Sequence, residues 1–162
     1  MRVITAPNRL EFLGKSVFLA GGITDCEWWQ DELISLIPKS LDVTLLNPRR
    51  RDFPIGDPSA AQEQIGWEFA ALELASIFSI WFSGGRSPQP ICMYELGRHV
   101  AKREVGGKLD RVAVGVDPSY IRKQDVEIQL GLVSKALRSS IAYSLSDHCE
   151  NIVKKVRKME VF

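Results

Sequence analysis

The residues with the clearest potential for chemistry lie in the segment 90–98, where Glu95 stands as a lone carboxylate. A hydrophobic run, residues 77–82, and a loop rich in Gly, Ser and Pro, residues 83–89, come before it. This order predicts a strand, a loop and a helix, which places Glu95 beside the carboxyl end of a sheet, where open α/β folds bind their ligands. Backbone N–H groups near a helix N-terminus favour an ionised carboxylate. Glu95 is therefore a candidate nucleophile, although most glutamates on helices are only exposed surface residues.

Two glycines and two polar residues follow two further hydrophobic runs. Gly21 and Gly22 would let a ligand approach the backbone closely because they lack a Cβ atom. Their surroundings form neither a GxGxxG fingerprint nor a P-loop, and a tight turn between strand and helix explains the pair equally well. Asn47 and Arg49 could orient hydroxyls or a phosphate, and an ordinary surface loop is the alternative.

Aromatic side chains and a second carboxylate flank the same predicted sheet edge. Trp81 and Phe82 close the run 77–82, and we expect one to face the core and the other to stack on a planar ring near the pocket. Trp67 and Glu68 open a predicted helix over this edge, either within the site or as a hydrophobic anchor beside a helix-start acid. The sequence contains no recognisable Ser–His–Asp set and no histidines at metal-ligand spacing.

The composition excludes several classes of protein. The 162 residues, 45% of them hydrophobic, predict a single domain, residues 1–162, with a sizeable core. With 21 Lys and Arg against 20 Asp and Glu, the net charge is +1, which gives no electrostatic argument for a nucleic-acid polymer or a membrane as partner. Three widely spaced cysteines without a CxxC pair, and the lack of a signal-peptide pattern or long apolar run, predict a cytoplasmic protein without disulfides or zinc.

Short β-like runs alternate with helical periodicity along the chain, which predicts an α/β fold. The expected strands are residues 3–6, 16–20, 43–46, 77–82 and 111–115, with a possible short last strand at 141–143. The expected helices cover residues 29–37, with Asp25 as cap, then 65–75, with Ile65, Phe69 and Leu72 on its apolar stripe, and 90–103, 120–137 and 149–156.

The handedness of parallel connections decides how these elements are arranged. Right-handed crossovers require helices on both faces of a largely parallel sheet. Gly21, Asn47, Phe82 and Gly115 then lie at the carboxyl ends of strands and line one edge, which is the expected pocket. The long loop 49–60 could fold over it.

Several segments, in this order along the chain, resemble the nucleoside 2-deoxyribosyltransferase superfamily, in particular its deoxyribosyltransferase-like branch. They are residues 17–23, 46–50, 64–68, 80–82 and 93–97, with residues 114–118 and 125–129 also fitting the branch. The likeness extends over residues 16–130, and its most specific part is the YELG segment around Glu95.

The resemblance implies a flavodoxin-like three-layer α/β sandwich with a mainly parallel five-stranded sheet, usually in a homo-oligomer. It implies cleavage of the N-glycosidic bond of (deoxy)nucleosides or their monophosphates without a cofactor, with Glu95 as the nucleophile. Attack on C1′ would form a glycosyl-enzyme, and a second nucleobase or water would then attack from the opposite face with overall retention. The expected partners are thus small molecules, a nucleoside or nucleotide and a nucleobase.

Departures from the family pattern leave the general acid open. Ser76 stands where many members have Asp, and the loop 83–89 lacks the carboxylate that protonates the base in well-studied transferases. Glu68 and Asp25 are the remaining candidate donors, and Ser83 and Ser87 are available for a 5′-phosphate, which the related nucleotide hydrolases bind with loop serines. Transfer to a second base is our first expectation, with hydrolysis, nucleotide binding without turnover, and cleavage of a larger nucleotide such as NAD as alternatives.

Overall fold

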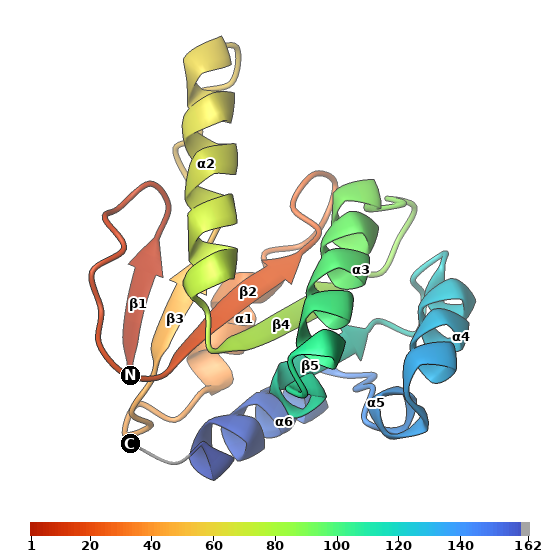
Figure 1. Ribbon diagram of the computed structural model, residues 1–162. Coiled ribbons are helices and arrows are strands. Elements are labelled where there is room, and N and C mark those ends of the chain that lie inside the picture. Colours follow the sequence, from red (N-terminus) through yellow and green to blue (C-terminus); the bar gives the residue numbers. More distant parts are fainter. Residues whose placement is uncertain (160–162) are drawn as a thin grey trace.

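In the computed structural model, which describes residues 1–159, five parallel strands form one sheet with helices on both faces (Figure 1). The strands are β1 (Arg2–Thr5), β2 (Ser16–Gly21), β3 (Thr44–Asn47), β4 (Ile77–Phe82) and β5 (Val112–Val116). Their order across the sheet is β1-β3-β2-β4-β5. The predicted fold class, a flavodoxin-like three-layer α/β arrangement, is confirmed.

Helices α2 (Pro58–Leu74) and α3 (Pro90–Val105) cover one face of the sheet, and α1 (Trp29–Leu36) and α6 (Leu145–Lys158) cover the other (Figure 1). Helices α4 (Lys123–Val133) and α5 (Lys135–Ser139) follow β5, and a 3₁₀ turn, η1 (Leu109–Arg111), precedes it. Within residues 1–159, no helix is both long and apolar enough to cross a membrane.

Alternation along the inner strands divides the core into two layers. In β2, Phe18 and Ala20 pack under α2 and α3, whereas Val17 and Leu19 pack under α1 and α6. Successive side chains of a strand point to opposite faces, so a strand covered on both sides must be apolar throughout. This requirement explains why the short continuous apolar runs predicted the inner strands correctly.

The order of the strands creates a crevice between β2 and β4. The connection through α1 leads from β2 to β3 on one side, and the connection through α2 then returns across β2 to β4 on the other. At such a switch point the loops after the two strands leave in opposite directions and open a space between them. The predicted position of Gly21, Asn47 and Phe82 at strand carboxyl ends is confirmed.

Two local predictions are wrong. Residues 141–143 do not form a strand, because only Ala142 pairs with the sheet, in a single bridge to Gly115. Asp25 does not cap the first helix: Trp28 occupies the N-cap position, without a capping side-chain bond, and Asp25 lies three residues earlier with a left-handed φ of 56°.

Helix α2 begins earlier than its apolar stripe predicted and turns a different face inward. The Asp57 side chain caps it by accepting a hydrogen bond from the Ser59 N–H at 2.9 Å, and Pro58 occupies its first turn. Ile65 and Phe69 are exposed, while Trp67 is buried. The stripe prediction is wrong at Ile65 and Phe69, whereas Leu72 is buried as predicted. The upper part of α2 projects beyond the sheet (Figure 1), so the sheet does not select which side is covered there.

Candidate active site

A cavity of about 250 Å³ lies at the crevice between β2 and β4, on the side of α2 and α3. Its walls are the end of β2 with the following loop, residues 20–24, and the first turns of α3 with the preceding loop. Pro48 and Glu68 close it from the side of α2. Five of the residues predicted from the sequence line this cavity, namely Gly21, Gly22, Glu68, Ser87 and Glu95.

Glu95 is a half-buried side chain in the second turn of α3. Burial raises its pKa from the usual 4.5 to about 7, and the nearby charge of Glu68 contributes in the same direction. The sequence predicts that the helix N-terminus favours the ionised form of Glu95. That expectation is wrong because the influence of the dipole fades beyond the first turn, where burial and a like charge dominate.

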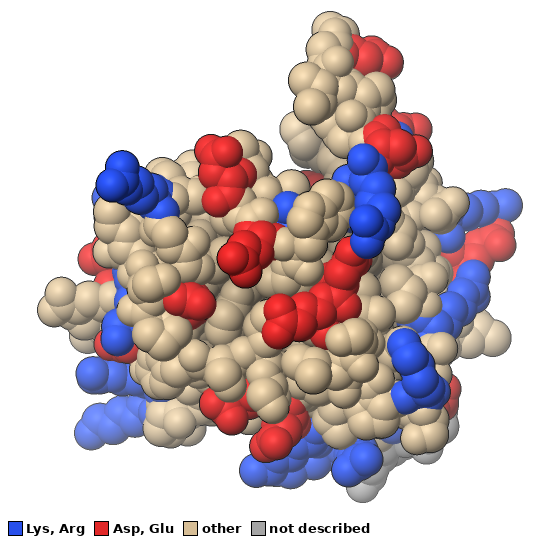
Figure 2. All heavy atoms as spheres, turned by 180° about the vertical axis from the view of Figure 1, so that it is seen from behind, with Lys and Arg blue, Asp and Glu red and all other residues tan. Residues whose placement is uncertain are grey.

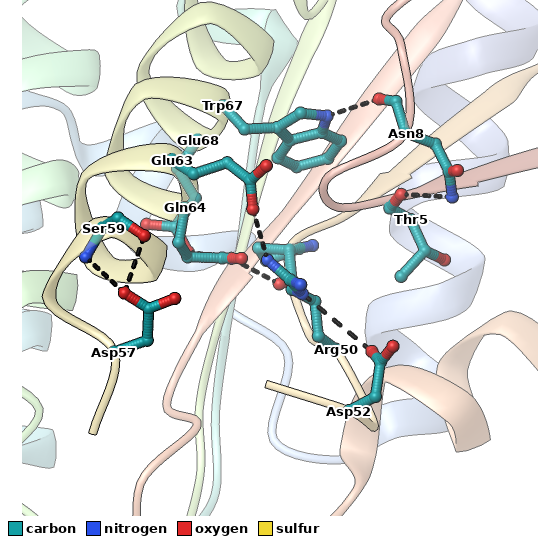
Figure 3. A network of polar contacts seen from close by, with 11 residues as sticks. Thr5, Asn8, Arg50, Asp52, Asp57, Ser59, Glu63, Gln64, Trp67 and Glu68 are labelled. Carbon is teal, nitrogen blue, oxygen red and sulfur yellow. Dashed lines mark hydrogen bonds and ion pairs between the residues drawn. The ribbon is translucent and has the colours of Figure 1, made fainter. Parts of the chain in front are cut away.

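Glu68 brings a second carboxylate to the cavity from α2 (Figure 3). Its Oε1 accepts a hydrogen bond from Gln64 Nε2 at 2.8 Å. Burial raises the pKa of Glu68, and the hydrogen bond from Gln64 opposes this rise because it stabilises the charged form. Both carboxylates of the cavity therefore retain protons at a higher pH than ordinary glutamates do.

Gln64 fixes the position of Glu68 relative to the neighbouring strand. The same amide nitrogen that donates to Glu68 also donates to the Pro48 carbonyl, at 2.7 Å (Figure 3). Turning the amide over would set its oxygen against that carbonyl, so the contact keeps Gln64 a donor toward Glu68. The role of Gln64 cannot be predicted from the sequence, because its one signal, the i, i+4 spacing to Glu68, is common on helices.

Asn47 and Arg49 lie next to the cavity but do not line it. The Arg49 guanidinium is buried and donates to backbone carbonyls of the loop after β2. These acceptors are Ile23 O at 3.3 Å, Cys26 O at 2.8 Å and Glu27 O. The guanidinium also lies over the Trp28 ring, 4.0 Å from its centroid, and the Asn47 side chain accepts from the Arg49 N–H at 3.0 Å. In this structure both residues brace the loop.

The two glycines are required by packing within the protein. A Cβ atom on Gly21 would lie 2.3 Å from the Trp81 carbonyl oxygen and 2.4 Å from the Trp29 ring. One on Gly22 would lie 2.5 Å from the Cys26 sulfur and 2.6 Å from the Gln89 amide oxygen. Any larger residue would displace backbone or buried side chains, so these positions set the floor of the cavity at backbone level.

Gln89 organises the loop on the other side of the crevice and was missed by the sequence analysis. It occupies the N-cap position of α3 with a left-handed φ of 46°. Its side chain donates to Ser83 O at 2.8 Å and to Ser87 O at 3.4 Å, and accepts from the Ser83 N–H at 3.3 Å. The side chain thus closes the loop that presents Ser87 to the cavity. Glutamine is not a preferred cap, so its type gave no signal.

The remaining predicted residues lie outside this cavity. Trp67 is buried beside Phe18 and donates to the Asn8 carbonyl at 2.7 Å (Figure 3). Phe82 is fully buried and stacks on Tyr120, and Trp81 faces α1 and α6. Neither Trp81 nor Phe82 thus stands where a ring could stack in the cavity. Asp25 lines a separate cleft on the far side of the sheet.

Cys92 lines the cavity, but its thiol is a poor candidate for chemistry. It is buried one helical turn before Glu95, and burial together with the Glu95 charge raises the pKa of its thiol far above the usual range. A thiol that stays protonated is a poor nucleophile. Glu95 and Glu68 are therefore the two carboxyl groups of this cavity, and both have raised pKa values.

Comparison with protein families supports the importance of this region. Residues 14–106, more than half of the 162, match the family model described as nucleoside 2-deoxyribosyltransferase like. The matched segment runs from β2 to the end of α3 and includes both carboxylates of the cavity. No curated protein matches the chain.

Proposed function

The chain belongs to the nucleoside 2-deoxyribosyltransferase-like family, and on this premise we propose that it cleaves the N-glycosidic bond of (deoxy)nucleosides and transfers the sugar to another nucleobase, with Glu95 as covalent nucleophile. The observation that carries the proposal is the pairing of Glu95 and Glu68 in one cavity at the crevice of the sheet. Paired carboxylates with perturbed pKa values are the usual means of breaking a glycosidic bond.

In the first step, an Oε atom of ionised Glu95 bonds to C1′ of the sugar. The bond from C1′ to the base nitrogen breaks, its electron pair goes to the base, and protonated Glu68 supplies the proton that neutralises the leaving base. The products of this step are the free base and a glycosyl ester on Glu95. In the second step, a nitrogen of another base attacks C1′, Glu95 leaves as carboxylate, and the proton lost by that nitrogen returns to Glu68.

The electrostatics of the cavity favour a singly protonated pair. Burial raises the pKa of both carboxyls, and the charge of one makes ionisation of the other harder. The pair therefore keeps a proton to higher pH than an ordinary glutamate does. The proposed reaction needs that proton on Glu68, so it must pass from Glu95 to Glu68 when the substrate binds. Gln64 engages only one oxygen of Glu68 and leaves the other free to carry that proton.

Trapping of the intermediate tests the nucleophile. Incubation with a 2′-fluoro-2′-deoxynucleoside should add the mass of the fluorinated sugar to a peptide containing Glu95. The Glu104→Gln variant, which changes an exposed glutamate on the same helix, should give the same adduct. An adduct on another residue, or slow-substrate turnover undiminished in Glu95→Gln, would contradict the assignment.

The fate of the sugar tests transfer. A deoxynucleoside incubated with a second nucleobase should yield a new deoxynucleoside and little free deoxyribose. Release of free sugar alone, at a rate that the second base does not change, would establish hydrolysis instead. Tight binding of the nucleoside without any product over hours would show that the protein binds nucleosides but does not cleave them.

A further inference from the structure

A second cleft, of about 630 Å³, opens at the same edge of the sheet but on the face covered by α1 and α6. It lies between the loops that follow β2, β4 and β5 and the start of α6. Four carboxylates line it, those of Asp25, Glu27, Glu32 and Asp117. None of the residues that line it is a lysine or arginine. Figure 2, which views the molecule from behind, shows acidic side chains grouped near the middle of this face, with basic ones mostly toward its margin.

The cleft also offers apolar surface and an unused hydroxyl. Three aromatic side chains line it: Tyr143 is exposed, whereas Trp29 and Trp81 are buried behind the wall. Ser83 lines it two residues after Trp81, and this side chain is only 5% exposed. Within residues 1–159 the Ser83 hydroxyl has no hydrogen-bond partner. A buried hydroxyl without a partner is costly, and a donor or acceptor on a bound molecule would satisfy it.

The spacing of the carboxylates indicates the shape of the ligand. In the described part of the chain, no three His, Cys, Asp or Glu side chains converge closely enough to hold a metal ion. The negative charge of the cleft is thus spread along its walls, which suits a ligand with separated positive charges. Ammonium groups pair with carboxylates and lie well against aromatic rings, while methylene groups pack on the same rings.

We propose that this cleft binds an aliphatic diamine or polyamine, with its ammonium groups at Glu27, Glu32 and Asp117 and its methylene chain against the Tyr143 ring. The Ser83 hydroxyl accepts a hydrogen bond from one ammonium group. This site is separate from the cavity of Glu95 and does not require that cavity to be catalytic.

The loop after β2 and the loop after β4 each line both the cavity of Glu95 and the cleft. In the loop after β2, residues 21–24 line the cavity of Glu95, and Asp25 and Glu27 line the cleft. In the loop after β4, Ser83 lines the cleft, whereas Ser87 lines the cavity. The Gln89 side chain joins the two parts of this second loop by hydrogen bonds to both serines. A ligand in the cleft is therefore coupled to the active site through these loops, and its effect on turnover rests on the proposed function.

Spermidine serves as the probe, and neutral 1,4-butanediol is the control ligand. Titration followed by ¹H–¹⁵N NMR and calorimetry should show saturable binding of spermidine alone. The largest shifts should fall on Glu27, the Trp29 indole and residues 83–85, with smaller shifts at Ser87 and Gln89. The double variant Glu27→Gln/Glu32→Gln should bind about tenfold more weakly, equivalent to about 1.4 kcal/mol. Both changed side chains are exposed, so the fold should be retained.

The matched control is Glu104→Gln/Glu150→Gln, which removes two exposed carboxylates elsewhere and should leave the affinity unchanged. Equal weakening in both double variants, or shifts spread over all acidic surfaces, would overturn the site. Shifts confined to the cleft, with Ser87 and Gln89 unmoved, would overturn the coupling. Because every readout is binding, the outcome does not depend on whether Glu95 is a nucleophile.

Discussion

The loop after β2 and the carboxylate pair of the cavity lie side by side, yet their buried charges differ in how they are compensated. The Arg49 guanidinium is surrounded by carbonyl acceptors and stacked on Trp28. Burial disfavours the charged form of Glu95, and within residues 1–159 no hydrogen bond contributes to its pKa. A buried charge with several hydrogen-bond acceptors stabilises a structure, whereas one without such partners and with a perturbed pKa marks a candidate site of chemistry.

Removing the Glu95 carboxylate is the strongest test of this contrast. Glu95→Gln should lower kcat/KM for nucleoside cleavage by about 10³-fold or more, because the variant lacks the proposed nucleophile. The variant should remain folded, since glutamine replaces a group that makes no internal hydrogen bond. Steady-state kinetics with a deoxynucleoside measure the loss, and activity within tenfold of the unchanged protein would refute the role of Glu95.

The braced region predicts the opposite behaviour. Arg49→Met should reduce the free energy of unfolding by about 3 kcal/mol, because several carbonyls lose a charged donor at once. Chemical denaturation measures this change. Arg51→Met is the control: Arg51 is also paired, with Asp31, but exposed, and its loss should cost less than about 1 kcal/mol. Equal effects of the two substitutions would show that the brace contributes nothing special.

The pH dependence of stability sharpens the same contrast. A carboxyl whose pKa rises on folding binds its proton more tightly in the native state, so stability falls as pH increases from about 4.5 to about 7. A pKa of about 7 instead of the usual 4.5 corresponds to about 3 kcal/mol at pH 8. Glu95→Gln should therefore be more stable than the unchanged protein at pH 8 and equally stable at pH 4. A difference that does not change between these pH values would contradict the raised pKa.

The smallest expected effect is that of substituting Gln64, which connects Glu68 to the Pro48 carbonyl next to Arg49. Gln64→Leu removes the donor that lowers the pKa of Glu68, so the alkaline limb of the pH–rate profile should move to higher pH. Loss of the fixed position of Glu68 should also lower kcat/KM about tenfold. Gln62→Leu, at an exposed position of the same helix, should change neither. A rate loss without any change in the profile would reduce Gln64 to a structural residue.

Much of the scaffold can be predicted from the sequence because burial on both faces leaves a simple signature. The runs at β2 and β4 are apolar at nearly every position, and their ends place Gly21 and Phe82 correctly. Glu95 could be named from its position near a helix start beside that edge, and Glu68 from the expected start of a helix that in fact begins at Pro58. Their raised pKa values could not, because desolvation depends on the packing of two helices that are distant in sequence.

Residues whose role depends on several backbone groups at once escape sequence reasoning. Nothing in the spacing of Arg49 indicates that carbonyls of residues 23–27 converge on it. The cap assigned to Asp25 was wrong because this brace holds the loop in a longer path before α1 begins. Alternation along β4 predicts that Trp81 and Phe82 point to opposite faces of the sheet, but it does not predict which of them faces the cavity.

The tight packing around Gly21 and Gly22 has a consequence for altering substrate preference. A substitution at Gly21 collides with backbone and a buried ring, and one at Gly22 collides with the Cys26 sulfur and the Gln89 amide, so the base of the recess offers no room for variation. Ile23, Thr24 and Ile91 border the same recess and have exposed side chains. Divergence toward new nucleobases, natural or engineered, should therefore accumulate along this rim.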